Sequence, residues 1–185
     1  MTAKTFRMPQ VLRRLARDRR GVSAVEFALV APMMLGLYFG CVEIADGIAV
    51  DRKVSLAAGA LANLPAQVST ITADEMNNIL DASKAILAPY SPAPLKMTVS
   101  CLNIDADRNV IVKWTVTRNG QPLTGDGVTL DDALKVANSQ LIYSQVSYDY
   151  TPIIGAAITG MITLSDKMYM APRVTAPTYV AAPCT

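Results

Sequence analysis

The sequence predicts an α+β protein in which a long N-terminal transmembrane helix precedes a small exported domain, built from an antiparallel sheet of about four strands with covering helices. Its 185 residues are 51% hydrophobic and only 17% charged, with a mean hydropathy of +0.29, which is too apolar for an ordinary soluble domain. Basic residues are concentrated at the N-terminus. Apolar residues follow a helical period before residue 65 and alternate after residue 94.

Residues 1–21 form a basic leader. They hold seven Lys and Arg and a single acid, Asp18, for a net charge of +6, whereas residues 22–185 hold ten bases and 14 acids for a net charge of −4. Lys and Arg beside a membrane span stay cytoplasmic, so the leader should be cytoplasmic and the rest exported. Since the leader adjoins an apolar segment and contains only one aromatic residue, Phe6, we expect no nucleic-acid partner.

The segment from Val22 to Val42 has 21 residues, and its only ionisable carboxylate is Glu26. At about 1.5 Å per residue a helix of this length spans ~31 Å, which is enough to cross a bilayer once. The helical pattern then continues outside the membrane to about residue 64, where Pro65 should stop it. Apolar side chains on this second half share one face that should pack on the exported domain: Val50, Val54, Ala57, Leu61 and Leu64.

A stripe of small residues follows one face of the predicted span at intervals of four. Such a face lets another helix approach closely, and its last part is a GxxxG pattern. A proline in the stripe should cause a kink or local melting, because it cannot donate the helical hydrogen bond. The stripe consists of Ala24, Ala28, Pro32, Gly36 and Gly40.

Residues 65–185 should form the exported α+β domain. Thr72 and Glu75 make the capping box of a second helix, which ends before the proline cluster that starts at Pro89. Alternating residues predict a strand pair at 95–101 and 110–116, joined by a turn at 105–109. We expect a short helix at 130–138 and further strands at 140–150 and 160–170.

No residue pattern in the chain indicates catalysis, a cofactor or a metal centre. The sequence has no histidine, which removes the commonest general base and zinc ligand. Asp105, Asp107 and Asn109 start like a calcium loop, but Val110 replaces its glycine and Val116 its final glutamate, so a hairpin turn is favoured, with metal binding left open. The sets Asp81–Ala85 and Ser165–Lys167 lack the partners that a metal site or a catalytic pair needs.

The border between the leader and the span contains Gly21, followed five residues later by Glu26. A cut after Gly21 would create an ammonium group on Val22, one helical turn from the Glu26 carboxylate, and the two charges could neutralise each other within a subunit or between neighbours. The run RDRRGVSAVEFALVAPMMLGLYFGCVEIADG resembles the N-terminus of the TadE-like family, the minor pilins or pseudopilins of the tight-adherence (Flp) pilus system. Further similarity lies around Val110–Val116, at 141–152, at 168–173 and at Cys184.

The resemblance implies a non-enzymatic protein of the bacterial inner membrane, with a cytoplasmic N-terminus and a periplasmic domain. Its implied partners are a prepilin peptidase that cuts between Gly21 and Val22, other major and minor pilins, and the inner-membrane assembly platform. The pilus would support surface adhesion, and it stays open whether this chain enters, caps or only primes the fibre.

Two other functions compete with this interpretation. Gly40–Cys41 resembles the end of a lipobox, which would make the chain a lipoprotein with a periplasmic binding domain; Tyr38 and the internal Glu26 do not fit that motif. An anchored enzyme is the third possibility, and the absence of histidine stands against it.

The exported domain contains two cysteines, Cys101 and Cys184. An oxidising compartment favours a disulfide between them, although Cys101 could instead be a small core residue with a free thiol. Cys184 lies in a proline-rich tail that the sequence suggests is held by little else.

Overall fold

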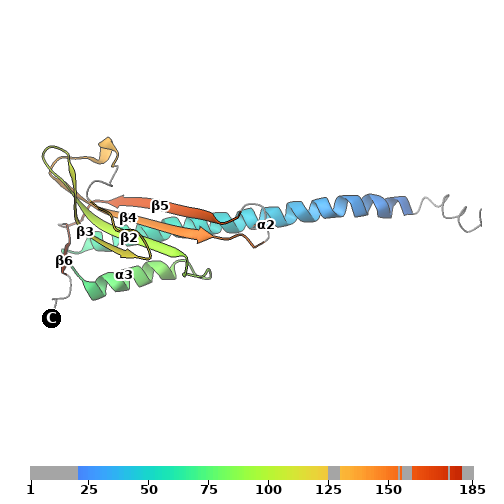
Figure 1. Ribbon diagram of the computed structural model, residues 1–185, viewed down its shortest axis with the longest axis horizontal. Helices are drawn as coiled ribbons and strands as arrows, with labels where there is room; N and C mark the ends of the chain where they lie inside the picture. The colour runs from blue at the N-terminus through green and yellow to red at the C-terminus, as the bar shows by residue number, and fades with distance from the viewer. Residues whose placement is uncertain (1–20, 125–129, 154, 156–159, 175, 181–185) are drawn as a thin grey trace, which may run out of the picture. The chain divides into compact units, whose positions relative to one another are not determined.

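The computed structural model describes residues 21–124, 130–153, 155, 160–174 and 176–180. The chain divides at Glu43 into two compact units, Met1–Val42 and Glu43–Thr185. The first contains the beginning of helix α2 (Val22–Asn63), and the second contains the rest of that helix and every strand (Figure 1). The predicted α+β class is confirmed.

Helix α2 runs for 42 residues and ends at Asn63. A short 3-10 helix, η2 (Pro65–Gln67), follows directly, as expected where a proline cannot continue the α-helical hydrogen bonds. Pro32 lies inside the helix without interrupting it, so the local melting expected there is not observed. A proline removes a single backbone donor, and the hydrogen bonds on either side maintain the helix.

The second unit contains a four-stranded antiparallel sheet, as predicted, in the order β3-β2-β4-β5 (Figure 1). Strands β2 and β3 form the predicted hairpin, and the register shifts between Cys101 and Leu102, where Lys113 is an extra residue that makes a bulge in β3. The strands span Leu95–Ile104 (β2), Val110–Arg118 (β3), Ser139–Tyr150 (β4) and Ile162–Met170 (β5).

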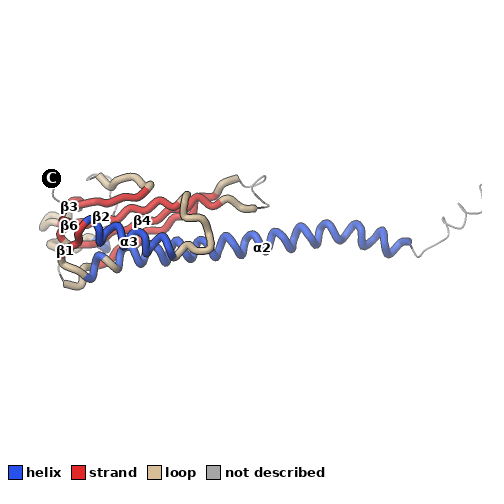
Figure 2. The backbone as a smooth tube through the Cα atoms, turned by 90° about the horizontal axis from the view of Figure 1, so that it is seen from below, coloured by secondary structure: helices blue, strands red, loops and turns tan. Residues whose placement is uncertain are grey.

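The second half of α2 and helix α3 (Ala73–Ala85) cover the same face of this sheet (Figure 2). The buried face of α2 includes four of the five predicted residues, whereas Leu64 is exposed. The Ser144 hydroxyl of β4 is fully buried and donates a 2.7 Å hydrogen bond to the Ala58 carbonyl of α2. The core joins residues of both helices and the two central strands: Val50, Val54, Ala57, Leu61, Met76, Leu80, Leu95, Met97, Val99, Ile142 and Val146.

The N-terminus of α3 has the predicted capping box. Thr72 Oγ1 accepts from the Glu75 backbone N–H, and Glu75 Oε2 accepts from the Thr72 backbone N–H at 2.8 Å. These hydrogen bonds lower the pKa of the Glu75 carboxyl group, because they favour its ionised form.

The short helix predicted at 130–138 is wrong. The segment contains only a 3-10 turn, η3 (Asp132–Leu134), and Asn138 adopts a left-handed conformation with φ of 58°. Leu130 is buried while Leu134 and Val136 are exposed, so no apolar face exists that would stabilise a longer helix by packing.

The sequence did not predict a small parallel sheet between β1 (Thr70–Thr72) and β6 (Thr178–Val180). Beside it, the Trp114 indole N–H of β3 donates a 2.8 Å hydrogen bond to the Pro177 carbonyl, and the Trp114 and Tyr179 rings lie 5.8 Å apart. The expectation that the C-terminal tail is held by little else is therefore corrected: strand pairing and Trp114 hold it as far as Val180.

We predict that Leu61→Ala lowers the free energy of unfolding by about 2–5 kcal/mol, because it removes a fully buried side chain between α2 and the sheet. Leu56→Ala on the same helix is the matched control and should cost less than about 0.5 kcal/mol, because Leu56 is 64% exposed. Urea titration of the detergent-solubilised full chain, followed by Trp114 fluorescence, measures both values. Equal losses would contradict the packing of α2 on the sheet.

Candidate functional site

The predicted processing and assembly residues all lie on the first part of α2. Gly21 directly precedes the helix, Val22 begins it, and Glu26 lies one turn further on. The Glu26 side chain is exposed and makes no hydrogen bond or ion pair with the described residues. This geometry puts the carboxylate within reach of a future amino terminus at Val22.

No residue from 22 to 42 is buried. The helix is long and apolar enough to cross a membrane, and this property indicates single-pass membrane anchoring. Gly36 and Gly40 have no atom within 4 Å of the position that a Cβ would occupy, so both offer open backbone surface. Ala24, Ala28 and Pro32 are exposed as well, and Cys41 is an exposed thiol within the helix.

Charged residues at the start of the second unit hold its loops against α2. Lys53 Nζ donates to the Ala88 and Ile86 carbonyls at 2.8 and 3.3 Å, in the turn that follows α3. Tyr90 donates from its hydroxyl to Asp46 at 3.0 Å. Burial and this contact raise the pKa of Tyr90, because both disfavour the phenolate.

A second contact of this kind joins α2 to the end of β4. Glu43 Oε2 accepts a 2.7 Å hydrogen bond from the backbone N–H of Gly155. The sequence gave no sign of these contacts of Glu43, Asp46 and Lys53, because their partners are backbone groups or residues more than 30 positions away.

Two of the three residue sets that could suggest metal binding or catalysis take part in structural contacts, and the third, Ser165–Lys167, lies within strand β5. The Asp105 carboxylate accepts from the backbone and side-chain nitrogens of Asn109 at 2.7 and 3.0 Å, and these bonds lower its pKa. Arg108 has a positive φ of 64°, as a tight hairpin turn requires. On α3, Asp81 forms an ion pair with Arg118, and the Ser83 hydroxyl donates to the Ile79 carbonyl. Within the described residues no group of three His, Cys, Asp or Glu side chains could hold a metal ion.

Cys101 lies at the edge of a pocket of about 340 Å³ between β2, β3 and the C-terminal tail. Its thiol is free among the described residues and only 2% exposed, and burial raises its pKa to about 11 despite the nearby Lys113. Thr178 and Tyr179 of β6 line the same pocket. Cys184 lies outside the described residues, so its pairing with Cys101 stays a prediction.

A helix that can cross a membrane once, followed by an α+β unit, is the arrangement of a single-pass membrane-anchored protein. A family model described as TadE-like protein matches residues 21–62, which confirms the TadE-like family for this segment and indicates involvement in the tight-adherence pilus system. The similar stretches noted after residue 100 lie outside the match. No curated protein and no solved structure matches the chain.

We predict a disulfide between Cys101 and Cys184 in the exported protein. From Val180, where β6 ends beside the Cys101 pocket, four residues can reach about 13 Å. A bridge closing more than 80 residues should stabilise the fold by about 4 kcal/mol in the chain-entropy model. Non-reducing peptide mapping should find the two linked peptides, and alkylation of both thiols in denaturant without reductant would exclude the bridge.

Proposed function

We propose that this chain is a minor pilin or pseudopilin that takes part in assembling a tight-adherence (Flp) type IV pilus and so supports surface adhesion. It is inserted in the bacterial inner membrane with its N-terminus in the cytoplasm and its domain in the periplasm. One observation carries the proposal: α2 begins at Val22, immediately after Gly21, and this start coincides with the TadE-like match.

Processing by a prepilin peptidase between Gly21 and Val22 is the first step. Gly21 has 3-10 helical conformation and directly precedes α2, so the scissile bond lies at the border of the α-helix. The cut removes the basic leader and leaves a new ammonium group at Val22. Without the leader, the span no longer carries the positive residues that hold its start in the cytoplasm.

Glu26 then sets the register of the mature helix among its neighbours. A carboxylate inside a membrane costs several kcal/mol when it has no partner, and the Val22 ammonium, of the same or an adjacent subunit, neutralises it. The small-residue face with Gly36 and Gly40 allows a neighbouring pilin helix to approach closely. Partners of these steps are the peptidase, other major and minor pilins, and the inner-membrane assembly platform.

The exported domain supplies partner contacts and, in this proposal, has no enzymatic activity. Support comes from the sets that could have carried chemistry. Asp105 accepts hydrogen bonds from Asn109, and Asp81 forms an ion pair with Arg118. The Ser83 hydroxyl donates to a carbonyl of its own helix, so each of these side chains takes part in a structural contact.

We predict that the mature protein begins at Val22 and that Gly21→Val accumulates as the uncut precursor, since a branched side chain should not fit at the scissile position. Gly21→Ala serves as the control and should retain at least partial cutting, because its side chain is small. Intact-mass and N-terminal analysis of the membrane-extracted protein decide the outcome. A mature chain that begins with a lipidated Cys41 would contradict the pilin proposal and support the lipoprotein alternative.

We predict that Glu26→Ala is inserted and cut but does not join the assembly, because the Val22 ammonium then lacks its counter-charge. Glu26→Asp keeps the charge on a shorter side chain and should retain part of the activity. Immunoblots of membrane and sheared-fibre fractions, with surface adhesion as a second readout, measure the effect. Wild-type assembly by Glu26→Ala would show that the carboxylate does not set the register.

A further inference from the structure

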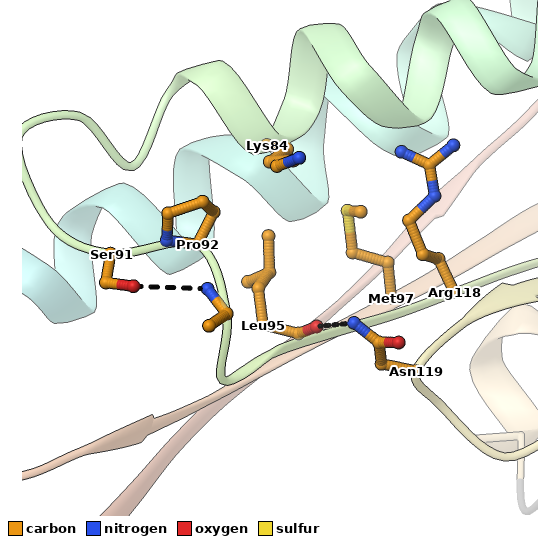
Figure 3. A pocket seen from close by; sticks show the side chains of 8 residues that line it. Lys84, Ser91, Pro92, Leu95, Met97, Arg118 and Asn119 are labelled. Atoms are coloured by element: carbon orange, nitrogen blue, oxygen red, sulfur yellow. Dashed lines mark hydrogen bonds between the residues drawn. The ribbon is translucent and has the colours of Figure 1, made fainter.

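A pocket of about 340 Å³ lies where β2 begins, between the end of α3 and the end of β3 (Figure 3). Its floor consists of Leu95 and Met97, which are each 1% exposed, and one wall is the loop with Ser91 and Pro92. The Asn119 side chain donates to the Leu95 carbonyl at 3.2 Å and fixes the opposite rim. The pocket is therefore a formed hollow with an apolar bottom.

The rim of this pocket is basic. Lys84 from the last turn of α3 and Arg118 from β3 both line it, and no acidic residue does. Arg118 is held by Asp81 and by a 3.2 Å hydrogen bond to Asn77. Lys84 makes no side-chain hydrogen bond or ion pair with the described residues, so its charge is available to an anion.

The other end of β2 presents the opposite charge. The β2–β3 turn carries Asp105, Ala106 and Asp107 and is held rigid by the bonds between Asp105 and Asn109. The Asp107 side chain is exposed and has no ion pair among the described residues. Asp131 and Asp132 lie at this end as well, since the Asn138 backbone N–H donates to the Asp105 carbonyl and joins their loop to the turn. Two bases oppose these acids, because Arg108 belongs to the turn and Lys135 forms an ion pair with Asp132. The four carboxylates still leave this end acidic.

The basic pocket and the acidic turn cannot meet within one molecule, because the ten residues of β2 hold them about 30 Å apart. A contact between these two charged surfaces can therefore form only between two molecules. We propose that the β2–β3 turn of a second copy of this chain docks in the pocket, with Asp107 of that copy on Lys84 and Ala106 over Leu95 and Met97.

This contact is heterologous, since each copy uses a different surface, and such contacts generate open linear arrays instead of closed dimers. The inference deepens the proposed function, on which it rests: it gives the periplasmic domain a self-contact that can repeat along a fibre. The turn is already ordered by its own hydrogen bonds, so docking should cost little conformational entropy.

A carbodiimide test detects the contact directly, because this reagent adds no spacer and therefore joins an amine to a carboxylate only when the two groups are in direct contact. Full-length chains with light and heavy nitrogen are co-expressed or mixed in membranes, treated, and digested for mass spectrometry. A mixed-isotope link between the Lys84 peptide and the 105–107 peptide is expected. The intramolecular pairs Lys96–Asp149 and Lys135–Asp132, both 2.7 Å apart, are internal positive controls.

A charge exchange supplies the matched controls. K84E alone and D107K alone should each reduce the link at least tenfold, while a mixture of the two variants should restore it, solely between chains of different isotope. K84R keeps the charge without the reactive amine and should lose the link but retain assembly.

Formation of both internal control links without any link from Lys84 to the turn would overturn the proposal. A link from Lys84 to a carboxylate of another protein would overturn the choice of a second copy. If the wild-type chain forms the link in membranes but never enters a fibre, the proposed function is wrong and the self-contact remains. If the wild-type chain is processed and assembled normally without the link, only the self-contact is wrong.

Discussion

Helix α2 is one continuous helix that must suit two different solvents. Within a bilayer no water can pair with a peptide group, so a segment there must pair its backbone groups internally, and α2 does so except where Pro32 has no N–H to donate. The backbone stays helical in both surroundings, and only the kind of side chain differs between them. Residues 22–42 expose apolar groups all round, whereas from Glu43 onwards charged residues occupy one side and buried ones the other. The sheet depends on this second pattern, because α2 supplies much of its core.

Small side chains determine how closely α2 lies on the sheet. Ala57 and Ala58 are fully buried, and their size lets the helix backbone approach β4 until the Ser144 hydroxyl can reach the Ala58 carbonyl. A buried hydroxyl without a partner would cost about 1–3 kcal/mol, so this hydrogen bond selects one position of the helix along the strand. Lys53 of α2 likewise positions the turn that follows α3, because it donates to the Ile86 and Ala88 carbonyls.

The sequence predicted those elements whose residues repeat with a regular period. Helix α2 and strands β2–β5 were found in this way, and Thr72 with Glu75 marked the start of α3 through a local motif. Strands β1 and β6 were missed because three residues are too few to show alternation, and the helix at 130–138 was predicted from apolar residues that turn out to share no buried face.

The same distinction applies to the candidate sites, since some are marked by spacing in the sequence and others only by the structure. Gly21 and Glu26 could be found because their spacing of five residues is itself the signal. The pocket around Lys84 and Arg118 could not, since 34 positions separate the two residues in the chain and only the strand order brings them together. Gly36, the fourth residue of the small-residue stripe, could likewise be recognised from its spacing. That no atom lies near its backbone could be seen only in the structure.

Both edges of the sheet carry features that discourage pairing with another sheet. On the edge strand β5, the Asp166 carboxylate accepts the Lys167 backbone N–H at 2.8 Å, and two adjacent charges therefore interrupt the edge. At the other edge, Pro177 and Tyr179 lie against Trp114 of β3. In the proposed function this domain meets copies of itself, and an open sheet edge would then allow indiscriminate strand addition. With both edges blocked, the ends of the strands are left for association. There the sign and position of charged side chains can determine which partner surface binds. Association at the ends therefore leaves the backbone ladder of the sheet undisturbed.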